Sequence, residues 1–160
     1  MEKIKMADIK IIEIDRAKVK VVKLSTEVAL PKYETTGSAG MDVRASISEP
    51  LVLGPLERKL IPLGIKIEIP EGYEIQVRPR SGLALKHGIG MVNSIGTIDS
   101  DYRGEIGAIL INLSKEPYTI HPGERIGQIV LNKISKIEWE VVDTLEETER
   151  GTGGFGHTGK

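Results

Sequence analysis

Residues 65–77 read Ile-Lys-Ile-Glu-Ile-Pro-Glu-Gly-Tyr-Glu-Ile-Gln-Val, and this stretch decides the fold class. Apolar and polar side chains alternate on both sides of residues 70–72, which is the period of a half-buried β-strand. Two alternating runs that flank a Pro/Gly turn predict a β-hairpin made of residues 65–69 and 73–77. This part of the chain is therefore expected to be β-structure.

Short β-rich runs recur along the rest of the chain, bounded by Gly, Pro, Asn or Ser. They cover residues 19–24, 51–53, 106–113, 118–120 and 126–131. The sequence has no amphipathic helical window of about ten residues and no internal repeat of about 20 to 50 residues, which disfavours an alternating βαβ fold. We expect an all-β domain built as a sandwich or a barrel.

The charges of the chain nearly cancel. The 160 residues carry 22 Lys plus Arg and 23 Asp plus Glu, for a formal net charge of −1. Without a basic field, neither nucleic acid nor an anionic membrane is an expected partner. No apolar run approaches the ~20 residues that cross a bilayer, and the N-terminus lacks the apolar region of a secretory signal. A cytoplasmic location is therefore expected.

The absence of cysteine excludes a disulfide framework, a thiolate nucleophile and a cysteine-type zinc site. The three histidines lie far apart in the sequence, at positions 87, 121 and 157, without the spacing of metal ligands on one element. A metal held by histidine is therefore not expected.

The two ends differ from the middle in composition. Residues 1–18 are charged, and we interpret them as an N-terminal extension with no assigned role, before a domain that spans residues 19–143. Residues 144–160 contain five glycines between Arg150 and Lys160. Because fixing a glycine backbone costs more entropy than fixing any other residue, this arm is expected to be flexible until it meets a ligand.

Three segments carry residues suited to chemistry. Pro79-Arg80-Ser81-Gly82 offers a guanidinium, a hydroxyl and the start of a helical turn, which suits a phosphate cradle or a plain strand-to-turn connection. Residues 96–104 bring Asp99 and Asp101 close to Tyr102. This pattern suits either a hairpin turn or a carboxylate that accepts a proton from water, with the aromatic ring against a sugar or base.

Two further polar residues lie near these segments in the sequence. The Asn93 amide both donates and accepts hydrogen bonds, as reading a base edge requires. Asp42 follows small residues and suits either the water shell of a metal or a hydrogen bond within a loop.

Taken in order, five segments resemble the five motifs of the homotrimeric dUTP pyrophosphatases, the dUTPase family. The match spans residues 19–160, with Gly127 where alanine is usual and His157 where serine is usual. The segments are Ala39-Gly-Met-Asp, Pro79-Arg-Ser-Gly-Leu-Ala, Gly96-Thr-Ile-Asp-Ser-Asp-Tyr-Arg-Gly, Gly123-Glu-Arg-Ile-Gly-Gln and Arg150-Gly-Thr-Gly-Gly-Phe-Gly-His-Thr-Gly.

The resemblance implies a distorted jelly-roll β-barrel of the dUTPase-like β-clip type. It also implies a homotrimer whose active sites lie at subunit boundaries and are closed by the arm, residues 144–160, of a neighbouring subunit. The implied reaction is hydrolysis of dUTP to dUMP and pyrophosphate with Mg²⁺ chelated by the triphosphate. That reaction keeps uracil out of DNA and supplies dUMP for dTMP synthesis.

The resemblance also assigns roles to residues. Asp99 is the implied general base, and Asp42 the implied contact to magnesium through water. Asn93 and the main chain of the hairpin that follows it would read uracil, and Tyr102 would lie under the deoxyribose. The complete set of implied substrate-binding residues is Arg80, Ser81, Gly82, Asn93, Ile98, Tyr102, Gln128, Arg150, Phe155 and Gly156.

Two alternatives stay open. A dCTP deaminase would share this fold and trimer, but that family lacks the glycine-rich tail with its arginine and phenylalanine. A non-catalytic nucleotide-binding module would have lost the base or a phosphate ligand, whereas this chain retains Asp99, Arg80 and Arg150.

Overall fold

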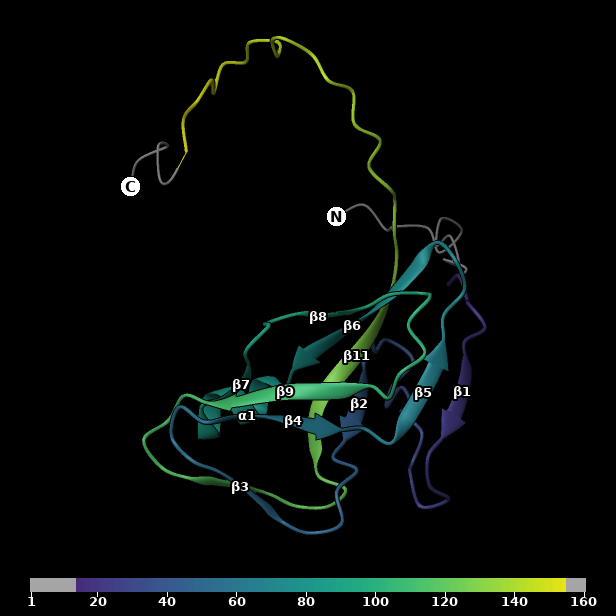
Figure 1. The fold of residues 1–160 in the computed structure, drawn as a ribbon, viewed down its shortest axis with the longest axis vertical. Helices are drawn as coiled ribbons and strands as arrows, with labels where there is room; N and C mark the ends of the chain where they lie inside the picture. Colours follow the sequence, from purple (N-terminus) through teal and green to yellow (C-terminus); the bar gives the residue numbers. More distant parts are fainter. Residues whose placement is uncertain (1–13, 155–160) are drawn as a thin grey trace, which may run out of the picture.

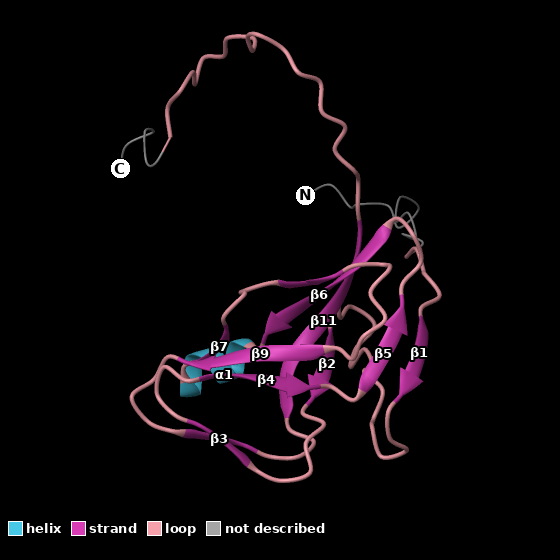
Figure 2. Cartoon of the chain, viewed as in Figure 1, coloured by secondary structure: helices cyan, strands magenta, loops and turns pink. Residues whose placement is uncertain are grey.

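Short antiparallel strands and one helix make up the regular structure in the computed structural model, which describes residues 14–154 (Figure 2). The predicted all-β class is confirmed. The elements are β1 Lys20–Lys23, β2 Met41–Arg44, β3 Leu51–Leu53, β4 Arg58–Pro62, β5 Ile65–Glu68, β6 Tyr73–Pro79, α1 Ser81–His87, β7 Ile89–Met91, β8 Gly96–Ile98, β9 Gly107–Asn112, β10 Tyr118–Ile120 and β11 Arg125–Lys133.

The described strands form four sheets around one apolar core, in a jelly-roll arrangement that does not close into a continuous barrel (Figure 1). The strand orders in the four sheets are β1-β5, β10-β3, β2-β11-β6-β8 and β4-β9-β7. Branched aliphatic side chains fill the core, among them Val43, Leu53, Ile61, Val77, Ile89, Ile106, Leu110, Ile120 and Ile126.

The predicted hairpin of residues 65–69 and 73–77 is wrong. The chain does turn at residues 70–72, where the Tyr73 N–H donates to the Pro70 carbonyl. However, β5 pairs with β1, whereas β6 pairs with β11 and β8. Alternation reports which face of a strand is buried, and both strands do bury their apolar face; it does not report the partner strand.

The hairpin expected after Asn93 is also wrong, because β8 pairs with β6, whereas the next strand, β9, pairs with β4 and β7. Asn93 lies in the turn between β7 and β8, and the Ser94 N–H there donates to the Met91 carbonyl. The two strands then join different sheets, because β7 pairs with β9 and β8 with β6. This turn therefore crosses from one sheet to the other.

The chain leaves the body after β11. Residues 134–154 contain no helix or strand and extend away in an arc (Figure 1). Within the described range of residues 14–154, no helix has the length and apolar character needed to span a bilayer.

Candidate active site

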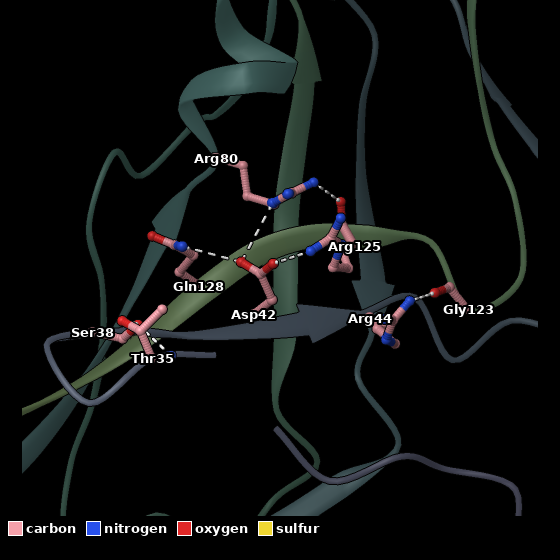
Figure 3. A network of polar contacts seen from close by, with 8 residues as sticks. All are labelled: Thr35, Ser38, Asp42, Arg44, Arg80, Gly123, Arg125 and Gln128. Atoms are coloured by element: carbon pink, nitrogen blue, oxygen red, sulfur yellow. Dashed lines mark hydrogen bonds and ion pairs between the residues drawn. The ribbon is translucent and has the colours of Figure 1, made fainter. Parts of the chain in front are cut away.

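Asp42 is the centre of a network of polar contacts (Figure 3). Its carboxylate, only 12% exposed, accepts a hydrogen bond from Arg125 Nη1 at 3.0 Å and one from Gln128 Nε2 at 3.0 Å. Arg80 Nε lies 3.4 Å from the same carboxylate, and Arg80 Nη1 donates to the Arg125 carbonyl at 3.1 Å. One negative charge thus holds two guanidinium groups side by side.

Strand pairing brings these residues together. Gln128 is the register partner of Asp42 on β2, so both side chains lie on one face of the sheet. A β-bulge between Arg125 and Gly127 shifts the register at this point. A Cβ on Gly127 would lie 3.2 Å from the Arg78 carbonyl oxygen, so the glycine permits a close approach of β11 to β6.

The turn before β11 is fixed by Glu124. This carboxylate accepts a hydrogen bond from the Tyr118 hydroxyl and another, at 2.9 Å, from the His121 main-chain N–H. Burial, together with the hydrogen bond to Glu124, raises the pKa of Tyr118 to about 12. The phenol therefore stays a hydrogen-bond donor at neutral pH and holds the start of β11, where Arg125 lies.

A cavity of about 250 Å³ lies on the other side of β6. It brings together four of the residues singled out from the sequence, namely Asn93, Ile98, Asp99 and Tyr102. Its other lining residues are Leu60, Val77, Gly96, Thr97, Glu105, Ile106, Gly107 and Ile109. We call this space the base cavity, after the nucleobase that Asn93 is predicted to read.

The Tyr102 ring has a fixed place at this cavity. Its hydroxyl donates to the Glu105 carbonyl at 3.0 Å, and its ring lies against Gly104 so closely that a Cβ there would overlap it. Glycine at position 104 thus leaves the space that the hydroxyl end of the Tyr102 ring occupies.

The Asp42 network and the base cavity are separate within one chain. The sheet order β2-β11-β6-β8 puts the network on one side of β6 and Asp99, which follows β8, on the other. In the β6–β8 register, Ile98, the residue before Asp99, lies opposite Ile75, near the start of β6. Arg80 directly follows Pro79, at the other end of β6. At ~3.3 Å per residue the two main-chain positions are about 20 Å apart.

The remaining site residues lie as follows. Ser81 and Gly82 open α1 and are exposed. Arg150 lies in the exposed arm, where its Nε donates to the Gly153 carbonyl at 2.8 Å. Phe155, Gly156 and the unusual His157 lie outside the described residues. The functional assignments of all these residues stay predictions.

Sequence reasoning did not single out Arg125 as a site residue. Arg125 belongs to the segment Gly123–Gln128 that resembles one of the family motifs, and its place in that motif could have identified it as a site residue. Its contact with Asp42 depends on the pairing of β2 with β11, which no local pattern in the sequence reports.

Among residues 14–154, no group of three or more His, Cys, Asp or Glu side chains is placed to hold a metal ion. The Asp42 carboxylate offers about four lone-pair sites and uses part of them on Arg125 and Gln128, with Arg80 Nε at 3.4 Å. It can still accept a hydrogen bond from a water. This donor set fits a magnesium ion held mainly by ligand oxygens and water, which is usual for this cation.

The family model for dUTPase matches residues 26–159, and the chain is similar to two bacterial proteins named deoxyuridine 5'-triphosphate nucleotidohydrolase. The one from Fusobacterium nucleatum is 65% identical over 91% of this chain and 99% of its own length. The one from Finegoldia magna is 59% identical over 89% and 99% of the two chains.

Solved structures of phage enzymes have the same fold. A mutant dUTPase of Staphylococcus bacteriophage 80alpha with dUpNHpp has a TM-score of 0.80 and 27% identity, covering 89% of this chain and 99% of its own. A mutant dUTPase of phage phi11 of S. aureus, described with a structural Mg(II) ion, has a TM-score of 0.72 and 25% identity, covering 81% and 99%.

Proposed function

Because the chain belongs to the dUTPase family, we infer that it is a dUTP diphosphatase, which hydrolyses dUTP to dUMP and pyrophosphate. The observation that carries this inference is the base cavity, which gathers the carboxylate of Asp99, the amide of Asn93 and the ring of Tyr102. These are the groups needed to activate water, read a base and support a sugar.

In the proposed reaction Asp99 is the general base. Its side chain is exposed at the cavity, so water reaches the carboxylate. The carboxylate accepts a proton from the water that attacks the α-phosphorus, while the bond from that phosphorus to the bridging oxygen breaks and pyrophosphate leaves.

Uracil and deoxyribose occupy the base cavity in this proposal. Asn93 and the main chain of residues 96–98, including Ile98, supply donors and acceptors for the uracil edge. A 4-amino group would present the wrong partners there, so cytosine is rejected. The Tyr102 ring lies under the deoxyribose and leaves no space for a ribose 2′-hydroxyl.

Arg80, Ser81, Gly82 and Gln128 bind the phosphates, with Arg80 oriented by the Asp42 network. Asp42 would contact magnesium through water, and the ion would neutralise charge on the triphosphate. Arg150, Phe155 and Gly156 belong to the arm that closes on the nucleotide. Phe155 stacks on uracil, and Arg150 pairs with a phosphate.

The expected assembly is a homotrimer with sites shared between subunits. The separation of Asp99 from Arg80 within one chain supports this, because a neighbouring chain can supply the missing half of the site. Residues 137–141 also alternate like a strand, and their apolar side chains are exposed: Ile137 by 72%, Trp139 by 82% and Val141 by 96%. A second copy of the chain would cover that face.

Sedimentation analysis is expected to give a particle of three times the 17.5 kDa chain mass. The closed ring buries the exposed apolar face of residues 137–141, so dilution should lower the specific activity together with the trimer fraction. A monomer with full activity would contradict the shared site.

Release of pyrophosphate from dUTP, dCTP, dTTP and UTP, with and without Mg²⁺, tests the proposed function. We expect turnover of dUTP alone, stimulated by Mg²⁺. Ammonia release from dCTP would identify a deaminase instead, and binding of dUTP without turnover would identify a non-catalytic module. The proposed role in the cell is to keep uracil out of DNA and to supply dUMP, in the cytoplasm and without a nucleic-acid or membrane partner.

Gly104→Ala is expected to lower kcat/KM for dUTP by about 10- to 100-fold, because the added methyl displaces the Tyr102 ring from the sugar. Steady-state kinetics with dUTP and UTP would measure it, and selectivity against UTP should fall as well. Gly37→Ala is the matched control, since a Cβ at Gly37 has nothing within 4 Å. Equal effects of both substitutions would refute the assigned place of the tyrosine.

A further inference from the structure

Tyr118 is a half-buried tyrosine on β10, and none of the five motif-like segments contains it. Its hydroxyl donates to the Glu124 carboxylate, and its ring lies against His87, with the two ring centroids 4.9 Å apart and the planes tilted by 48°. His87 is the last residue of α1, and Glu124 directly precedes β11. One side chain therefore contacts both the end of the helix and the start of the strand.

Arg80 depends on the same two elements. It directly precedes α1, so the helix sets the position of its main chain. Its side chain is bound at the start of β11, where Nη1 donates to the Arg125 carbonyl at 3.1 Å (Figure 3). The Arg125 side chain in turn binds Asp42, which lies 3.4 Å from Arg80 Nε. The direction of the Arg80 guanidinium therefore follows from the placement of α1 relative to β11.

The charge of Arg80 also acts on the phenol of Tyr118. Burial, followed by the hydrogen bond to Glu124, raises the pKa of Tyr118 to about 12, whereas the positive charge of Arg80 lowers it. An effect of this kind requires the guanidinium to lie near the phenol. Tyr118, Glu124 and Arg80 therefore form one local group, in which the hydroxyl donates a charge-assisted hydrogen bond.

Main-chain hydrogen bonds hold the turn of residues 121–124 without help from Tyr118. The Glu124 N–H donates to the His121 carbonyl at 3.0 Å, and the Ala45 N–H donates to the Glu124 carbonyl at 2.8 Å. Ala45 directly follows β2, so these bonds fix the turn to β2 and not to α1. Loss of the phenol hydroxyl should therefore leave the turn folded and release only its placement against the helix.

Resting on the proposed function, we propose that Tyr118 is a positioning residue that fixes α1 against the start of β11 and so aims Arg80 at the phosphates of the nucleotide. The base cavity has no lining residue in common with this group. Binding of the phosphates and binding of the nucleoside can therefore be tested separately.

Tyr118→Phe removes the hydroxyl and keeps the ring against His87. We expect the inhibition constant of a non-hydrolysable dUTP analogue to rise by at least about fivefold, because a hydrogen bond to a charged group is worth a factor of about ten or more. The inhibition constant of deoxyuridine, which has no phosphate for Arg80 to bind, should stay within about twofold. Competition against dUTP turnover by the full-length enzyme measures both constants.

Glu124→Gln tests whether Tyr118 acts through the carboxylate, since the amide keeps the size of the side chain and removes its charge. The double variant Tyr118→Phe/Glu124→Gln should bind the analogue at most about twofold more weakly than the weaker single variant, because both substitutions break the same contact. Tyr33→Phe is the matched control: it loses the same hydroxyl group, and Tyr33 is 51% exposed and lies outside the Asp42 network. It should leave both inhibition constants within about twofold.

A role of Tyr118 in folding or assembly alone would raise both inhibition constants in parallel, and that result would overturn the proposal. Unchanged binding of the analogue by Tyr118→Phe would overturn it as well, and so would multiplied effects in the double variant. An unaltered enzyme that does not hydrolyse dUTP would refute the proposed function and this inference together. An active enzyme whose two constants change in parallel, or not at all, in Tyr118→Phe would refute only the inference.

Discussion

Asp99→Asn is expected to lower kcat for dUTP by about 100- to 10,000-fold, the usual contribution of a general base. The amide keeps the size of the side chain and its place at the base cavity but no longer accepts a proton from water. Affinity for a non-hydrolysable dUTP analogue should stay within a few-fold, because the contacts of the ground state are preserved. Single-turnover kinetics and calorimetric titration would measure the two quantities.

Asp101→Asn is the matched control, because it removes the same charge from the same turn. Asp101 does not line the base cavity, so a much smaller loss of kcat is expected. Near-normal turnover of Asp99→Asn, or a larger loss in Asp101→Asn, would show that the base is assigned to the wrong carboxylate.

Removal of residues 150–160 is expected to lower kcat/KM for dUTP by at least about 100-fold while leaving the melting temperature nearly unchanged. The described part of this segment is exposed or half-buried and makes hydrogen bonds only within the arm, so few core contacts are lost. In the proposed mechanism Arg150 and Phe155 hold opposite ends of the nucleotide, and closure excludes water other than the nucleophile.

Limited proteolysis gives an independent measure of this closure. The arm should be cut rapidly in the free enzyme and slowly with a non-hydrolysable dUTP analogue, because the binding energy offsets the entropy of ordering its glycines. Lys160→Ala should behave like the unaltered chain. Full activity of the truncated enzyme would refute the closing arm. Equal protection of the arm from proteolysis with and without the analogue would refute it as well.

The sequence predicts the buried faces better than the strand partners. Ile65, Ile67 and Val77 were expected to face the core from their alternation, and all three are buried. The strands Leu51–Leu53 and Tyr118–Ile120 have the predicted bounds. Strands such as Met41–Arg44 and Gly96–Ile98 were missed, because three or four residues that include charge or glycine do not make a readable alternation.

For the candidate site, too, the sequence predicts local features better than contacts between distant strands. The residue types at Asp99, Asn93 and Tyr102 pointed to one place, and the cavity brings them together. The contact of Asp42 with Arg125 joins residues far apart in the sequence and depends on the β2–β11 pairing. Only the folded chain reveals that contact.

The separation of Asp99 from Arg80 within one chain has a genetic consequence. If each site takes its base from one subunit and its arginine from the next, Asp99→Asn and Arg80→Ala damage different halves of it. Any three-membered ring that contains both kinds of subunit then has one position where an intact aspartate meets an intact arginine. Two alleles that are each inactive would therefore complement one another when expressed in the same cell.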